Sequence, residues 1–172
     1  MLLWRPLLPS DLPALSAIAA QVHPGFPEDD AVFAERQRLC PGGTMLLEKN
    51  GAPAGYMLSH PWRFGQLPAL NALLGEIPRN ADTYYLHDLA LLPAARGSGA
   101  AGMAVEKLLD TARTAGFAHV SLVAVNGSQP FWRRHGFAVE ERPELAGKLA
   151  SYEAAARLMV HRFALVKAGG AA

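Results

Sequence analysis

The sequence predicts an α/β fold with a mixed, mostly antiparallel sheet and helices on both of its faces. Residues 44–49 and 53–60 are predicted strands joined through Asn50-Gly51, the strongest short signal for an antiparallel hairpin. Residues 84–125 then follow as strand, helix and strand, and such a unit makes its two strands parallel with a right-handed crossover. A hairpin beside a parallel unit requires a mixed sheet.

The elements before the hairpin begin with a short apolar strand over residues 2–5. Ser10 is expected to cap the helix that follows, in which apolar residues recur at helical spacing from 12 to 22. The acidic run 28–30 places negative charge where a second helix begins, which favours its N-terminal dipole, and the glycines at 42–43 end that helix.

The elements after the hairpin lead to the parallel unit. Residues 66–74 are expected to form a short helix, and residues 84–91, rich in aromatic and apolar side chains, a strand. A clean apolar stripe over 101–112 predicts a core-facing helix whose end Gly116 caps. Residues 120–125 complete the unit as a buried strand.

The C-terminal part supplies two more strand candidates, at residues 136–140 and 154–165. No repeat, charge block or internal linker interrupts the chain, so residues 1–166 are expected to form one domain. The tail 167–172, which ends in glycines and alanines, is expected to be disordered.

The composition narrows the class of protein. The chain has 172 residues, is 51% hydrophobic and carries a net charge of +1, which argues for a globular domain and against binding of nucleic acid. Cys40 is its only cysteine, so no internal disulfide forms. Since no run of about 18 apolar residues occurs, we expect no membrane span and a cytoplasmic location; a homodimer stays open.

A glycine-rich loop over residues 96–102 joins the predicted strand to the predicted helix. Small residues let the backbone approach an anion, and the free amides of a helix start favour negative charge. An ordinary tight turn is the plainer alternative. Gly97, Gly99 and Gly102 also match the dinucleotide fingerprint, but residues 92–96 separate the loop from its strand and no acidic residue follows at about 20 positions, so a nicotinamide site is rejected.

The loop belongs to a larger set of matching motifs. Residues 96–101 fit the pattern Arg or Gln, two residues, Gly, one residue, Gly or Ala. Residues 89–93 (Leu-Ala-Leu-Leu-Pro) are similar to a strand end "L-x-V-x-P", and residues 126–137 to "N…Y-x-x-x-G-F". In these motifs, over about 84–140, and in element order over nearly the whole chain, the protein resembles the GNAT superfamily of acyl-CoA-dependent N-acetyltransferases.

The resemblance implies a GNAT-type sheet in which two parallel strands, ending at Leu91 and Val125, splay apart around acetyl-CoA as co-substrate, with no metal. The pyrophosphate would rest on loop amides and the pantetheine along the first strand. The cofactor-binding residues implied in this way are Leu89, Ala90, Leu91, Arg96, Gly97, Ser98, Gly99, Ala100, Ala101, Asn126, Phe131 and Trp132.

The attacking amine must be neutral, so a base is needed. His87 lies in Leu86-His87-Asp88-Leu89-Ala90-Leu91, which resembles the "L-H-x-L-A-V" strand of arylalkylamine acetyltransferases, where a histidine helps to deprotonate the amine. Strand alternation puts Tyr85 and His87 on one face and Asp88 on the other, unless a bulge intervenes. A histidine hydrogen-bonded within the core is the alternative.

At the position of the residue that would protonate the departing thiolate, this chain differs from the family pattern. Family members often have a tyrosine four residues before the Gly-Phe, whereas this chain has Trp132, whose indole gives up no proton usefully. Either the thiolate leaves unassisted or another group replaces the tyrosine. Tyr152 is the replacement that we predict, against the alternative of a tyrosine that only packs.

The acceptor site is expected to involve Phe26, His60, Trp62 and Tyr85, although a structural role is favoured for His60. The aromatic and apolar character of these side chains suits a small amine with a hydrophobic body. The acidic run 28–30 could attract such an amine, but the charge preference of a helix start explains it fully.

The function expected from the sequence is transfer of acetyl from acetyl-CoA to a small primary amine by direct attack. A protein N-terminus or a lysine side chain is the alternative acceptor. A CoA-binding sensor without turnover is the alternative of another class, because the tyrosine is missing.

Overall fold

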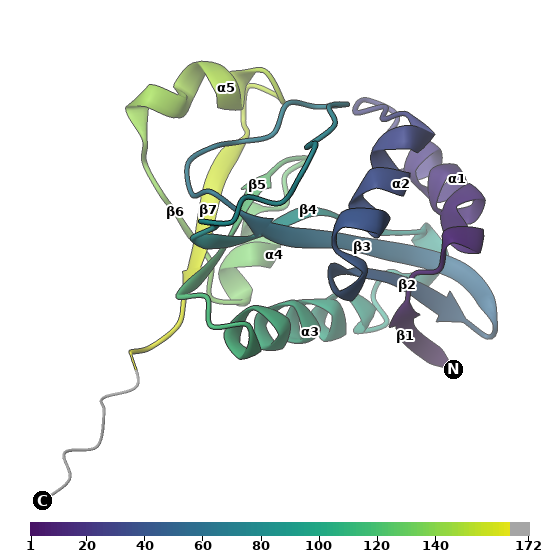
Figure 1. The fold of residues 1–172 in the computed structure, drawn as a ribbon. Helices are drawn as coiled ribbons and strands as arrows, with labels where there is room; N and C mark the ends of the chain where they lie inside the picture. Colours follow the sequence, from purple (N-terminus) through teal and green to yellow (C-terminus); the bar gives the residue numbers. More distant parts are fainter. Residues whose placement is uncertain (166–172) are drawn as a thin grey trace, which may run out of the picture.

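The computed structural model describes residues 1–165 and contains one seven-stranded sheet, shown in Figure 1. The predicted disordered tail, 167–172, lies outside the described residues. The strands are ordered β1-β2-β3-β4-β5-β7-β6 across the sheet. Their bounds are β1 Leu2–Pro6, β2 Thr44–Lys49, β3 Ala52–Trp62, β4 Thr83–Leu91, β5 His119–Ala124, β6 Ala138–Val139 and β7 Arg157–Arg162.

Helices cover both faces of the sheet, as predicted (Figure 1). On one face, α1 (Leu12–Val22) and α2 (Asp30–Leu39) bury Leu15, Ile18 and Phe33 against β2 and β3. On the other face, α3 (Ala100–Thr114) and α4 (Gln129–Arg134) close a second cluster around Leu108 and Trp132. The short α5 (Ala146–Ala150) precedes β7. Among the described residues, no helix is long and apolar enough to cross a membrane.

The mixed topology is confirmed. Every neighbouring pair of strands is antiparallel except β4 and β5, which are parallel. Their pairing covers Tyr84–Leu86 against Val120–Leu122 and then stops, although β4 continues to Leu91. The two strands therefore separate towards their carboxyl ends, and this gap positions the candidate site.

The predicted hairpin is present between β2 and β3. Asn50 and Gly51 both have positive φ, at 53° and 81°, as the tight turn that matches strand twist requires. The predicted long helix is also present as α3, and Gly116 follows it with φ of 86°, which closes the helix end.

The expected start of α1 and the expected end of α2 are both wrong. Ser10 does not cap α1, because residues 9–11 form a 3₁₀ turn and Asp11 precedes the helix, its carboxylate bound to Arg5. The glycines at 42–43 do not end α2, which stops at Leu39 before a second 3₁₀ turn.

Residues 66–74 form no helix. The buried carboxylate of Glu35 on α2 accepts the backbone N–H groups of Leu74 and Gly75, at 2.6 and 3.0 Å, and so holds this segment as a loop. Asn71 within it has φ of 55°, which a helix does not allow. A tertiary contact here replaces the hydrogen bonds that a helix would make.

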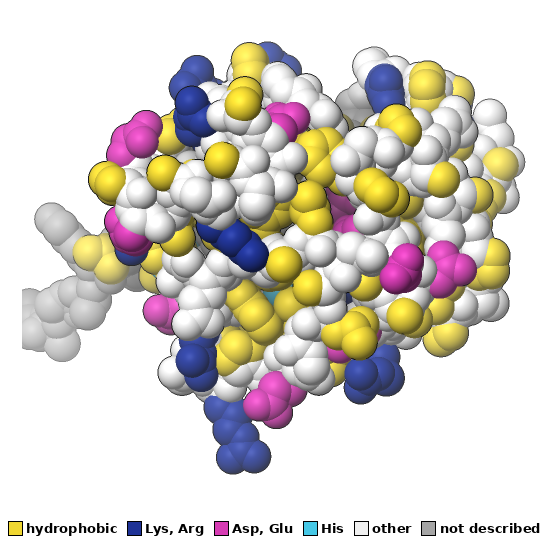
Figure 2. All heavy atoms as spheres, turned by 90° about the horizontal axis from the view of Figure 1, so that it is seen from above, with side chains coloured by type: hydrophobic (Ala, Val, Ile, Leu, Met, Phe, Trp, Pro, Cys, Tyr) yellow, Lys and Arg dark blue, Asp and Glu magenta, His cyan; other side chains and the backbone are white. Residues whose placement is uncertain are grey.

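Charged groups of both signs lie around the face shown in Figure 2, while hydrophobic side chains gather towards its middle. This distribution agrees with the net charge of +1 and creates no patch of a single sign on that face.

Candidate functional site

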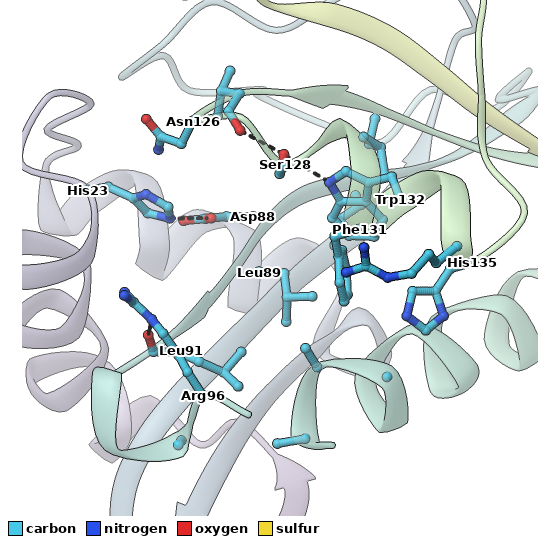
Figure 3. Close-up of a pocket in the computed structure, with 18 of the residues that line it drawn as sticks. His23, Asp88, Leu89, Leu91, Arg96, Asn126, Ser128, Phe131, Trp132 and His135 are labelled. Carbon is cyan, nitrogen blue, oxygen red and sulfur yellow. Dashed lines mark hydrogen bonds and ion pairs between the residues drawn. The ribbon is translucent and has the colours of Figure 1, made fainter. Parts of the chain in front are cut away.

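A cavity of about 590 Å³ opens where β4 and β5 separate (Figure 3). The residues of the sequence-predicted cofactor set that line it are Leu89, Leu91, Arg96, Gly97, Gly99, Ala100, Ala101, Asn126, Phe131 and Trp132. The structure does not bring the other two members to its wall. Ala90 is buried on the opposite face of the sheet with the α1 cluster, and the Ser98 hydroxyl donates to the Ala95 carbonyl.

The glycine loop enters this cavity as the start of α3. Gly97 and Gly99 have φ of 71° and 85°, and a Cβ on either would meet no atom within 4 Å. Gly99 caps the helix without a side-chain hydrogen bond. The first amide of α3, that of Ala100, makes a long contact of 3.4 Å with Ser98 Oγ, and the helix start favours an anion. Arg96 lies beside this helix start and donates through Nε to the Leu91 carbonyl at 3.2 Å. The loop therefore fits a pyrophosphate held by main-chain groups.

The unpaired edge of β4 supplies further donors. The Leu92 N–H donates to the Ala54 carbonyl of β3, at 2.8 Å. Because successive N–H groups of a strand point to opposite edges, the N–H groups of Leu89 and Leu91 face the gap left by β5. An extended chain or a carbonyl oxygen in the cavity could accept from both.

A β-bulge in β4 changes which way its side chains point. Asp88 pairs with Leu58 and Leu86 with Ser59, so His87 is the extra residue. Without the bulge His87 and Asp88 would lie on opposite faces; with it, both turn towards α1 and α2. They consequently share one site.

His87 is held by an acidic partner. Its Nε2 lies 2.8 Å from Glu28 Oε1, and both side chains are almost buried, at 8% and 7% exposed. A carboxylate on Nε2 keeps the proton on that nitrogen, so the Nδ1 lone pair is the free basic atom of the ring. Nδ1 has no hydrogen-bond partner within residues 1–165.

Glu28 is a residue that the sequence did not assign to the site. Its attribution to the start of a helix is wrong, because Glu28 precedes the cap residue Asp29 and pairs with His87 instead. The two residues are 59 positions apart in sequence, and no spacing pattern connects them.

A second pair lies beside the first. His23 Nε2 is 2.8 Å from Asp88 Oδ1, and the Tyr56 hydroxyl donates to the other carboxylate oxygen. Burial opposes the charge on His23, but the hydrogen bond and charge of Asp88, with a contribution from Glu28, outweigh it and raise the pKa of His23. Burial likewise opposes the charge on Asp88, yet its bonds to His23 and Tyr56 lower its pKa.

A smaller cavity, of about 60 Å³, adjoins the large one, and both are lined by His23, His87, Asp88, Val123 and Val125. Of the predicted acceptor residues, Phe26 and Tyr85 line this small cavity. His60 and Trp62 line neither cavity. His60 is only 1% exposed, and burial lowers its pKa to about 3, so it is a neutral core residue beside Tyr85.

The two aromatic residues considered for the acid do not offer a proton to the large cavity. Trp132 lines it, but its indole N–H donates to Ser128 Oγ at 3.2 Å. Tyr152 lines the small cavity, where its hydroxyl donates to the Pro68 carbonyl and burial raises its pKa to about 12. In the part of the chain that the structure describes, no three His, Cys, Asp or Glu side chains group as metal ligands.

The mixed sheet splits between two parallel strands, and the glycine loop at the start of α3 lines the cavity that opens there. A family model described as "Acetyltransferase (GNAT) family" matches residues 11–137. The chain therefore belongs to the GNAT family, whose members are acyl-CoA-dependent acetyltransferases. The comparison with curated proteins gives no match.

Solved structures support the same fold. The loading GNATL domain of CurA from Lyngbya majuscula superposes with a TM-score of 0.76 at 17% identity, over 94% of this chain and 98% of that one. The GphF GNAT-like decarboxylase in complex with isobutyryl-CoA gives 0.74 at 22% identity, over 93% and 98%. The ribosomal-protein-S18-alanine N-acetyltransferase from Escherichia coli gives 0.68 at 19% identity, over 98% of each chain.

Proposed function

We propose that this protein transfers the acetyl group of acetyl-CoA to a small primary amine by direct nucleophilic attack. The observation that carries the proposal is the junction of the two cavities. The large cavity offers main-chain donors to the cofactor, the small cavity offers room for an acceptor, and His87 with its partner Glu28 lies on their shared wall.

The large cavity has groups suited to each part of acetyl-CoA. The amides around Gly97 and Gly99 suit the pyrophosphate, with Arg96 adding a positive charge. The N–H groups of Leu89 and Leu91 suit the pantetheine amides and the thioester oxygen. One donor aimed at a developing oxyanion contributes about 3–4 kcal/mol of transition-state stabilisation.

His87 is proposed as the base. An alkylammonium titrates near pH ~10, so a proton must leave the nitrogen before attack. Glu28 keeps the His87 proton on Nε2, and Nδ1 then accepts the amine proton. The likeness of residues 86–91 to the arylalkylamine strand agrees with this role.

The small cavity favours a small amine as the acceptor. Phe26, Leu70 and Tyr85 give it an apolar surface, while Glu28 and Asp88 provide negative charge for an ammonium group. A protein N-terminus and a lysine side chain are the alternatives; the name of the Escherichia coli neighbour gives an alanine of ribosomal protein S18 as its acceptor.

Two other activities compete with transfer. A CoA-binding sensor without turnover would account for Trp132 at the tyrosine position. A decarboxylase, as named for GphF, would have to hold a substrate carboxylate near Glu28 and Asp88, whose charges oppose it.

The test is to incubate the protein with acetyl-CoA and a panel of arylalkylamines, alkylamines and peptides bearing a free N-terminus or a lysine, and to measure free thiol. Parallel reactions with malonyl-CoA measure carbon dioxide. We expect thiol release with small amines only. Tight CoA binding without release across the panel would support the sensor, and carbon dioxide release would support the decarboxylase.

A further inference from the structure

His23 occupies a prominent place in the site and has no part in the scheme above. It follows the last residue of α1, and its ring reaches Asp88 on β4, with Nε2 2.8 Å from Oδ1 (Figure 3). Asp88 is fixed in turn by the Tyr56 hydroxyl on β3. Three elements thus converge to orient one imidazole.

The other ring nitrogen of His23 is buried and, among residues 1–165, has no hydrogen-bond partner. A buried polar atom without a partner is destabilising, because it has lost its hydrogen bond to water and gained no other. With Nε2 committed to Asp88, Nδ1 is the only ring position at which His23 can exchange a proton with a bound molecule. Four other buried side-chain nitrogens among residues 1–165 also lack a partner, but only His23 lines the cavities, so a bound molecule could supply the missing partner there.

The location of His23 suits the thioester. It lines both cavities, as His87 does. In Figure 3 the His23–Asp88 pair lies on the opposite side of the large cavity from Phe131 and Trp132, with Leu89 between them. A thioester between the cavities would therefore pass His23.

We propose that His23, oriented by Asp88, is the general acid that protonates the departing sulfur of CoA. This inference rests on the proposed acetyl transfer. It assigns the acid role to a residue at the end of α1, in place of the aromatic side chains at 132 and 152.

The protons and bonds balance with the two histidines. The amine nitrogen forms a bond to the acetyl carbon as the carbon–sulfur bond breaks and its electron pair moves to sulfur. An acceptor that binds as an ammonium first loses one proton through His87 Nδ1 to solvent. On attack His87 Nδ1 takes the second proton from the nitrogen, and His23 Nδ1 gives its proton to the sulfur. His87 then returns a proton to solvent and His23 regains one, so the free protein is restored.

The charges facing His23 favour its protonated form. Asp88 on β4 and Glu28 before α2 raise its pKa, while burial and the positive charge of Arg96 after β4 oppose this. Because the raising contributions prevail, the imidazolium persists above histidine's ordinary pKa of about 6.5. As an acid it is active at low pH and lost as pH rises through its pKa.

The experiment compares kcat against pH, at saturating acetyl-CoA and amine, for the protein and its His23→Gln variant. We expect the variant to lose about a hundredfold in kcat, the low end of general acid catalysis, and to lose the alkaline limb of the profile. His119→Gln is the matched control, because His119 lines neither cavity; its profile should be unchanged. Calorimetry of CoA binding verifies that each variant is folded.

Asp88→Asn provides a second measurement that retains the imidazole. Without the carboxylate, the alkaline limb should move to lower pH while CoA binding persists. If the protein acetylates amines and both variants keep the original kcat and alkaline limb, the thiolate leaves unassisted and the proposal for His23 is overturned. If the protein itself releases no thiol with any amine, the proposed function fails and the acid role with it.

Discussion

The role proposed for His87 depends on Glu28, a residue 59 positions away in the sequence. A lone strand histidine could equally be a core residue, and His60 shows that outcome one strand away, neutral and enclosed. The difference lies in the partner: a carboxylate on Nε2 leaves the opposite nitrogen basic and open to the cavities. At the residue scale, function is thus decided by hydrogen bonds rather than by residue type.

Replacing Glu28 tests this pairing. We expect Glu28→Ala to lower kcat by about 10- to 100-fold, because the ring loses the acceptor that fixes its tautomer and orientation. Glu28→Gln keeps a hydrogen-bond acceptor without the charge, so its kcat should lie between those of Glu28→Ala and the unchanged protein. Steady-state rates at saturating substrates measure both.

The control for this pair is Asp30→Asn. Asp30 belongs to the same acidic run, but it accepts from Ser16 on the surface and lines neither cavity. If the variants at positions 28 and 30 lost kcat equally, a specific role for Glu28 would be contradicted.

At the element scale, α3 presents its N-terminus to the cavity and turns away from it at its other end. Both ends carry a glycine with positive φ, Gly99 at 85° and Gly116 at 86°. A Cβ at either position would meet no atom within 4 Å. The two positions therefore share a left-handed backbone that suits glycine but would strain an L residue, and they differ in what they face.

That symmetry gives a matched pair of variants. Gly99→Val and Gly116→Val should each lose about 1–2 kcal/mol or more of stability, because an L residue is strained in the left-handed region. Only Gly99→Val should also abolish CoA binding, since its side chain would occupy the space in front of the loop amides. Calorimetric titration with CoA, beside thermal unfolding, separates the two effects.

Two results would refute the loop assignment: CoA binding retained by Gly99→Val, or lost equally by Gly116→Val.

The bulge in β4 is a second feature that acts at the level of an element. It places His87 and Asp88 on one side of the sheet, and strand alternation alone would have separated them.

Across the whole molecule, the His23–Asp88 pair links α1 to the sheet and couples stability to pH. Asp88 has a lowered pKa in the folded state, so its contribution is present above the unfolded pKa of about 3.9 and is lost as pH falls through the folded value. His23 has a raised pKa, so its contribution is complete below about 6.5 and is lost as pH rises through the folded value. The pair stabilises most between these limits.

Thermal or urea unfolding at several pH values checks this linkage. The difference in unfolding free energy between the protein and Asp88→Asn should be largest near pH 5.5 and smaller at pH 3 and pH 9. A difference that stays constant over this range would show that the pair contributes by packing alone.

The sequence by itself determined the fold class, the hairpin, α3 and the glycine loop that faces the large cavity. These features are encoded locally: in the apolar period of a helix, in Asn50-Gly51 at a turn, and in a continuous motif from 96 to 101. His87 was also identified in this way, because it lies within a motif of its own strand.

The polar centre between the two cavities depends on long-range packing. His23 and Asp88 are 65 positions apart, and they meet because α1 ends over the sheet exactly where a bulge turns β4. The same folding removed His60 and Trp62 from the cavities and held residues 66–74 as a loop on Glu35. Such contacts depend on how distant elements pack, and no local pattern of residues specifies them.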